Sequence, residues 1–219
     1  MLRPVDIAVA FDAAMTDAQE GRWAAADVRH HLGIPRATLS KSFERLREAR
    51  VFRGAFINRS VLAAMLPLMP SLAPIRRESD TLASGLVTGF AAPAFAGHFQ
   101  GPSPLVWQVE GGPDHGVPIQ PLHPSLPAHI LAAGDESRHA MLAYLDAVRG
   151  GRAREVAHGI EGLRLLCNLP RSPGMGRHVA VGALMAAIVG RILGEDSGSL
   201  VTGAFVGAGV GAFAGQGID

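Results

Sequence analysis

The chain has 219 residues, a formal net charge of +1 and 48% apolar residues. So high an apolar content excludes a wholly disordered chain, because disordered segments have too little apolar surface to form a core. The near-zero net charge, taken as a total, indicates neither a nucleic-acid partner nor a membrane surface. Cys167 is the only cysteine, which excludes an intrachain disulfide. No apolar stretch of signal-peptide length precedes the polar run at residues 12–20, so we expect a cytoplasmic protein.

The first 50 residues carry the apolar spacing of three helices. The first helix is expected over residues 4–19. The second covers residues 24–32 and ends at Gly33, which can take the left-handed conformation of a tight turn. The third begins at Pro35, and its buried face is expected to contain Leu39, Phe43 and Leu46.

The opposite face of the third helix carries short hydrogen-bonding side chains near its start and cations further on. A helix that enters a DNA major groove needs this order, because its first turns reach base edges while later cations meet phosphates. After this helix, residues 51–59 alternate around Gly54, which predicts a small basic β-hairpin. We expect bases to be read by Arg36, Thr38, Ser40 and Lys41. We expect phosphates to be held by Arg45, Arg53 and Arg59.

Positive charge is concentrated in this part of the chain. Residues 21–60 contain nine basic and three acidic residues, a local balance of +6. Such a cluster favours DNA binding. A protein-binding winged helix, or a three-helix bundle with a solvated basic face, remains the alternative.

Residues 27–49, DVRHHLGIPRATLSKSFERLREA, resemble the helix-turn-helix of bacterial winged-helix regulators of the MarR and GntR type. The resemblance implies double-stranded DNA as a partner. One recognition helix reads few base pairs, so we also expect a homo-oligomer, most simply a dimer. Arg29 departs from the motif because it stands where alanine is usual. Either the helices cross more loosely there or the arginine stem turns outward.

The resemblance extends over about residues 4–166, to a group of bacterial regulators that join this motif to a C-terminal region of unknown ligand. It implies a DNA-binding regulator and names no effector. The matching segments are residues 85–88 (GLVT) with 91–93 (AAP), 104–107 (PLVW), 121–127 (PLHPSLP) and 146–155 (DAVRGGRARE).

Eight prolines between residues 85 and 127 exclude long helices and predict an irregular region over residues 71–134. The spacing of its histidines fits no metal motif, so we expect no metal and no cofactor. We expect these histidines to lie in loops and to be exposed to solvent. They are His98, His115, His123, His129 and His139. No nucleophile elbow, phosphate-binding loop or dinucleotide fingerprint is present, and we do not expect an enzyme.

Residues 135–170 predict two amphipathic helices that meet at Gly150 and Gly151. Arginines lie beside this break, where they could bind an anion or pair with nearby carboxylates. Ion pairs are favoured because the carboxylates are so close in sequence. The arginines are Arg149, Arg152 and Arg154, and the carboxylates are Asp146 and Glu155. Trp107 is expected to cap a core rather than line a ligand pocket.

The last 47 residues repeat a small residue every fourth position, on one face of each of two expected helices. They resemble bacterial glycine-zipper hairpins. Residues 197–218 are uncharged and, as a helix of roughly 30 Å, are long enough to span a bilayer core, although Arg191 interrupts the first helix. Membrane insertion and a soluble hairpin packed on its own domain or on a second subunit both remain open. The repeating positions are Gly182, Ala186, Gly190, Gly194, Gly203, Gly207, Gly211 and Gly215.

The sequence thus predicts a mainly α fold with a small β-wing, in four regions. These are a winged helix-turn-helix at 1–70, an irregular region at 71–134, a helical pair at 135–170 and a glycine-zipper helical hairpin at 171–219. The leading function is sequence-specific DNA-binding transcriptional regulation. The alternative is a protein-interaction or antitoxin-like adaptor, cytoplasmic or tethered to the inner face of the cell membrane by its tail.

Overall fold

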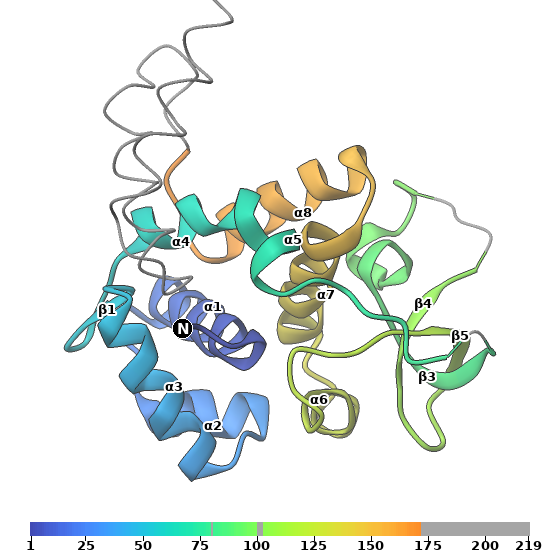
Figure 1. Cartoon of the computed structure of the whole chain (residues 1–219), viewed down its shortest axis with the longest axis horizontal. Helices are drawn as coiled ribbons and strands as arrows, with labels where there is room; N and C mark the ends of the chain where they lie inside the picture. The colour runs from blue at the N-terminus through green and yellow to red at the C-terminus, as the bar shows by residue number, and fades with distance from the viewer. Residues whose placement is uncertain (80, 100–102, 172–219) are drawn as a thin grey trace, which may run out of the picture. The chain divides into compact units, whose positions relative to one another are not determined.

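The computed structural model describes residues 1–79, 81–99 and 103–171 (Figure 1). The predicted glycine-zipper hairpin lies outside these residues. The described part is mostly helical with a small amount of sheet, and Leu2–Arg171 form one compact unit. The three regions predicted between residues 1 and 170 are therefore joined in a single body. In this part of the chain, no helix has both the length and the hydropathy of a membrane span.

The helices predicted in residues 1–50 and 135–170, and the hairpin predicted in residues 51–59, are present near their expected ends. The N-terminal helices are α1 Pro4–Glu20, α2 Ala25–Leu32 and α3 Arg36–Glu48. An antiparallel hairpin follows, made of β1 Phe52–Arg53 and β2 Phe56–Ile57, with Gly54 in its turn at φ 62°. The chain continues through α4 Arg59–Met65, the 3-10 turn η1 Leu66–Leu68 and α5 Met69–Leu72. The C-terminal pair is α7 Glu136–Gly150 and α8 Ala153–Leu166.

Helix α1 lies inside the compact unit, and every residue from Val5 to Thr16 is buried. It packs against α2 and α3, against α4 and against α7 (Figure 1). A helix that is apolar nearly all round is stable only when other elements cover it on every side. The N-terminal helices and the C-terminal pair consequently share one core, which runs through α1.

Gly33 ends α2 as the sequence predicts, in the left-handed conformation at φ 61°. A second constraint acts at the same position, because a Cβ atom on Gly33 would lie 2.5 Å from the ring of His129. The turn between α2 and α3 therefore needs glycine both for its backbone conformation and for the close approach of a helix that lies about 100 residues later.

The region predicted to be irregular contains a small sheet and a helix, so that prediction is wrong. Strands β3 Ala83–Thr88, β4 Leu105–Gln108 and β5 Asp114–Pro118 each pair with both of the others, which closes the sheet on itself. The closure needs Gly85, because a Cβ atom there would lie 2.1 Å from the carbonyl oxygen of Trp107. Two 3-10 turns follow β3, η2 Gly89–Ala91 and η3 Pro93–Phe95, and α6 Leu126–Ala133 precedes α7.

Asp146 on α7 joins the sheet to the helical core. Its fully buried carboxylate accepts hydrogen bonds from Thr88 Oγ1 at 2.8 Å and from Trp107 Nε1 at 2.7 Å. It also pairs with buried Arg149, whose Nε donates to the carbonyl oxygen of Ala73 at 2.7 Å. Burial raises the pKa of Asp146, while Arg149 and the two other donors oppose that effect. The expected burial of Trp107 and the expected ion pair of Arg149 are both confirmed.

Cys167 follows α8, and its buried thiol donates to the carbonyl oxygen of Phe11 in α1 at 3.6 Å. Burial raises the pKa of this thiol to about 12.

Since the thiolate is the reactive form, we expect a disulfide reagent at pH 8 to label the folded chain roughly 1000-fold more slowly than the chain in urea. Stopped-flow labelling would measure both rates. Equal rates would show that the end of α8 does not pack against α1.

Candidate functional site

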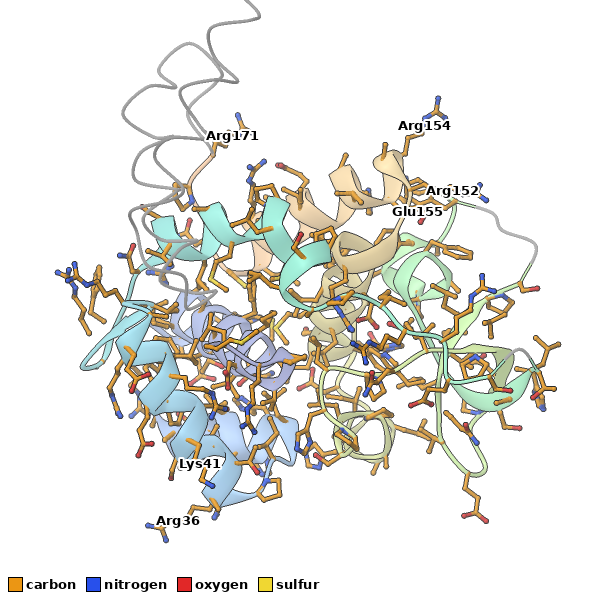
Figure 2. All side chains as sticks on the ribbon, viewed as in Figure 1. Arg36, Lys41, Arg152, Arg154, Glu155 and Arg171 are labelled. Carbon is orange, nitrogen blue, oxygen red and sulfur yellow. The ribbon has the colours of Figure 1, made fainter. Side chains whose placement is uncertain are left out.

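Helix α3 divides cleanly into a buried face and an exposed face. Leu39, Phe43 and Leu46 face the core as predicted, together with Ser42. The four residues predicted to read bases lie on the outer side. Arg36, Ser40 and Lys41 are exposed and Thr38 is half-buried. Arg36 projects away from the body at the N-terminal end of the helix (Figure 2).

The β1–β2 hairpin is held beside α3 by an aromatic cluster that the sequence analysis missed. The ring of Trp23, in the loop before α2, lies 5.6 Å from the ring of Phe43 and 4.9 Å from that of Phe52. Its Nε1 also donates to the carbonyl oxygen of Ala55, in the hairpin turn, at 2.8 Å. The cluster fixes the hairpin relative to α3, and it leaves Arg53 and Phe56 exposed at the tip.

Arg45 does not have the phosphate-binding position predicted for it. Its guanidinium makes a bidentate ion pair with Asp6 of α1. Nε donates to Oδ2 at 2.7 Å, and Nη2 donates to Oδ1 at 2.6 Å. The Arg45 side chain is 17% exposed and that of Asp6 is 0% exposed. The hydrogen bonds to Asp6 raise the pKa of Arg45 further. Arg45 therefore compensates a buried charge and is not available to DNA.

Arg59 is likewise engaged within the fold. Its Nη2 donates to Asp17 of α1 at 2.6 Å, and its Nε donates to the carbonyl oxygen of Cys167 at 3.1 Å. The phosphate-binding prediction for Arg59 is also corrected. Asp6 and Asp17 lie outside the window of residues 21–60, so two of its positive charges are neutralised from elsewhere. The local balance of +6 is thereby reduced to +4.

Five of the seven cations that remain exposed in residues 21–60 come from the outer side of α3, the turn that follows it and the hairpin. They are Arg36, Lys41, Arg47, Arg50 and Arg53, and the other two, Arg22 and Arg29, precede α3. Two acids, Glu44 and Glu48, are exposed on the same helix. The surface is therefore basic at the start of α3 and mixed in charge from Glu44 to the end of the helix. Arg29, which departs from the helix-turn-helix pattern, is exposed on α2, so its side chain turns outward.

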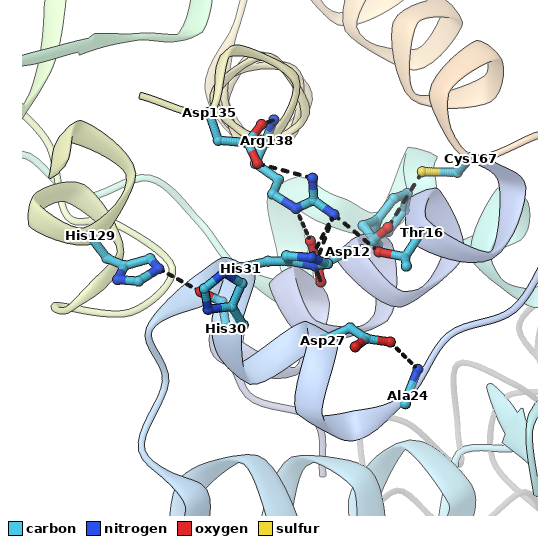
Figure 3. Close-up of polar contacts among 11 residues, drawn as sticks. Asp12, Thr16, Ala24, Asp27, His30, His31, His129, Asp135, Arg138 and Cys167 are labelled. Carbon is cyan, nitrogen blue, oxygen red and sulfur yellow. Dashed lines mark hydrogen bonds and ion pairs between the residues drawn. The ribbon is translucent and has the colours of Figure 1, made fainter. Parts of the chain in front are cut away.

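A buried polar network holds α2 against the rest of the molecule (Figure 3). Arg138 of α7 donates to Asp12 of α1 at 3.0 Å and to Thr16 of α1 at 3.2 Å, and its Nη2 lies 2.8 Å from His31 Nδ1 of α2. It also pairs with Asp135 at 3.0 Å, at the start of its own helix. One arginine thus joins the three helices α1, α2 and α7.

The carboxylates of this network have opposite pKa shifts. Burial raises the pKa of Asp12, against the opposing effects of His31 and Arg138. Burial would also raise the pKa of Asp135, but the backbone and the side chain of Arg138 donate to it and lower its pKa overall. Helix α6 makes a second polar contact with α2, in which His129 Nε2 lies 2.7 Å from the carbonyl oxygen of His30. Neither contact could be paired from the sequence, because the partners lie about 100 residues apart.

The other residues considered for a site are dispersed. Arg152 and Arg154 are exposed beside the start of α8 (Figure 2), and Glu155 accepts the backbone N–H of Arg152. Asp135 and His139 do not form a ligand pair, because His139 Nε2 bonds the carbonyl oxygen of Val87 at 2.7 Å. Within residues 1–79, 81–99 and 103–171, no group of three His, Cys, Asp or Glu side chains could hold a metal ion.

Comparison of the chain with models of protein families, with curated proteins and with solved structures finds no match.

Proposed function

We propose that this chain is a sequence-specific DNA-binding transcriptional regulator. Helices α2 and α3 with the β1–β2 hairpin form its winged helix-turn-helix. The observation that carries the proposal is the outer surface of α3. It presents Arg36, Ser40 and Lys41 to solvent, while Leu39 and Phe43 anchor the opposite face in the core. A helix fixed on one side and polar and basic on the other can enter the major groove without rearranging the fold.

The position of the hairpin also supports the proposal of DNA binding. The Trp23 cluster holds the hairpin beside α3, with Arg53 exposed at its tip. In the proposed complex, Arg36, Thr38, Ser40 and Lys41 read bases, and Arg53 binds phosphate together with Arg47 or Arg50. Arg45 and Arg59 have no part in it, because their guanidinium groups pair with Asp6 and Asp17.

A footprint on duplex DNA tests this proposal. The probe is a labelled fragment from the region upstream of the chain's own gene, with the full-length protein. We expect two protected half-sites about 34 Å apart, one helical turn, because a dimer would place two recognition helices on the same side of the duplex. Protection should survive an excess of unrelated duplex. Absence of protection, or equal competition by unrelated duplex, would contradict sequence-specific binding.

A second candidate function is a protein-interaction or antitoxin-like adaptor. Two observations favour it. Glu44 and Glu48 are exposed on the outer side of α3, where they would repel phosphates, and Phe56 is 64% exposed at the hairpin tip, where an apolar side chain could contact a protein. A stoichiometric protein partner that co-purifies with the chain, together with indifference to DNA, would favour the adaptor.

The C-terminal segment belongs to both proposals. Its small residues at every fourth position support a glycine-zipper hairpin that either joins two subunits or tethers the chain to a membrane. Fractionation of the full-length protein distinguishes the two. Recovery without detergent as a dimer supports subunit packing, and recovery only with detergent supports a membrane tether.

A further inference from the structure

A cavity of about 450 Å³ lies at the end of the small sheet. It is bordered by the end of β3, the turns η2 and η3, Pro104 just before β4 and the first residue of β5. Carbon-rich side chains form most of its walls, chiefly Val87, Phe90, Phe95, Phe99 and Pro104. Cavities of this size that are lined by aromatic and aliphatic side chains are typical sites for small organic ligands.

One carboxylate faces this cavity. Asp114, at the start of β5, accepts the backbone N–H of Val87 at 3.3 Å and is half-buried. It is the only charged side chain among the described residues that line the cavity, and the described residues provide it with no ion-pair partner. The Asp114 carboxylate thus borders walls that are largely apolar.

Each of the three buried aspartates among the described residues has an arginine partner. Asp6 pairs with Arg45, Asp12 with Arg138, and Asp146 with Arg149. Half-buried Asp114 pairs with no arginine in the part of the chain that the structure describes. Its position is fixed by the closed sheet, in which it pairs with Gly85. The carboxylate is thus held in place in a cavity and lacks the cation that each buried aspartate has.

We propose that this cavity binds an organic ammonium ion with an apolar group. The ammonium group would pair with Asp114, and the faces of Phe90 and Phe99 would add cation–π attraction. The apolar part would lie against Val87 and Pro104. An organic anion of the same size is disfavoured, because it would face the Asp114 carboxylate without any basic side chain among the described lining residues. This inference does not depend on DNA binding.

Calorimetric titration of the full-length protein tests the proposal with ligands of one shape and three charges. The probes are 2-phenylethylammonium, neutral 2-phenylethanol and anionic phenylacetate, followed by benzyltrimethylammonium and tetraethylammonium. We expect saturable binding of at least one ammonium ion below 10 mM, with 2-phenylethylammonium binding about tenfold more tightly than the alcohol and phenylacetate binding least. Failure of all three ammonium ions to saturate, or an equal or tighter affinity for phenylacetate, would overturn the proposal.

Three variants assign the binding to this cavity. Asp114→Asn retains an acceptor for the N–H of Val87 but removes the charge, so it should abolish the tenfold preference for the ammonium ion over the alcohol. Glu110→Gln removes one charge from the exposed loop between β4 and β5 and should leave both affinities unchanged. Ala96→Leu places a larger side chain at an exposed position of the cavity wall and should lower the affinity for every probe. An unchanged preference in Asp114→Asn, or unchanged affinities in Ala96→Leu, would contradict the assignment.

Discussion

Replacement of Asp146 by alanine is expected to lower the free energy of unfolding by about 3–5 kcal/mol, the usual cost of removing one partner from a buried ion pair. The substitution would leave the Arg149 charge inside the core and deprive Thr88 and Trp107 of their acceptor. Urea unfolding followed by circular dichroism measures this change. Because these partners come from β3, β4 and α7, the loss should appear in the unfolding of the whole compact unit.

The matched control for Asp146 is Glu161→Ala on α8. Glu161 also pairs with an arginine three residues later, Arg164, but at 3.8 Å and with 49% of the acidic side chain exposed. Exposed pairs contribute at most about 1 kcal/mol, so this variant should remain close to the parent. If Asp146→Ala and Glu161→Ala lost the same stability, the Asp146 network would not hold the sheet on the helical core.

Replacement of Arg45 by alanine is expected to cost about 3 kcal/mol of stability and to leave the salt dependence of DNA binding unchanged. The stability loss follows because Asp6 would remain buried in α1 without its cation. The salt dependence should not change, because an arginine already paired with a carboxylate releases few counterions on meeting a phosphate. Urea unfolding and DNA titrations at several salt concentrations measure the two effects separately.

Arg47→Ala is the matched control, because Arg47 lies two residues later on the same helix and is exposed. Its removal should change stability by no more than about 0.5 kcal/mol. The double variant Asp6→Ala/Arg45→Ala should lose less stability than the two single variants together, because it removes both charges of one pair. Equal stability of Arg45→Ala and Arg47→Ala would return Arg45 to the candidate DNA surface.

The helices of this fold were predictable because their signals are local. Apolar residues spaced by three and four identified α1, α2, α3, α7 and α8, and Gly33 marked the turn before α3. The small sheet was not predicted, because its strands are short, contain glycine and proline, and lie in a segment where prolines suggested irregular structure. What closes the sheet is the approach of one backbone to another at Gly85, which leaves no periodic signal in the sequence.

The pairing of the charged residues was the least predictable part. Arg45 was assigned to DNA from its place on α3, but its partner Asp6 lies 39 residues earlier. Arg59 was misassigned for the same reason, since Asp17 lies 42 residues away. One signal was present in the sequence. Asp6 and Asp12 interrupt an otherwise apolar helix, and a buried carboxylate requires a cation from elsewhere in the fold.

The salt dependence of DNA affinity tests most directly whether the outer surface of α3 and the hairpin bind DNA. Each phosphate neutralised contributes about 0.9 to the slope of log affinity against log salt concentration. We predict that Arg36→Ala/Lys41→Ala reduces the magnitude of this slope by about 2, relative to the parent chain. Arg154→Ala, which removes an exposed arginine near the start of α8, should leave it unchanged (Figure 2). An affinity independent of salt, or a double variant with the slope of the parent, would contradict DNA binding by this surface.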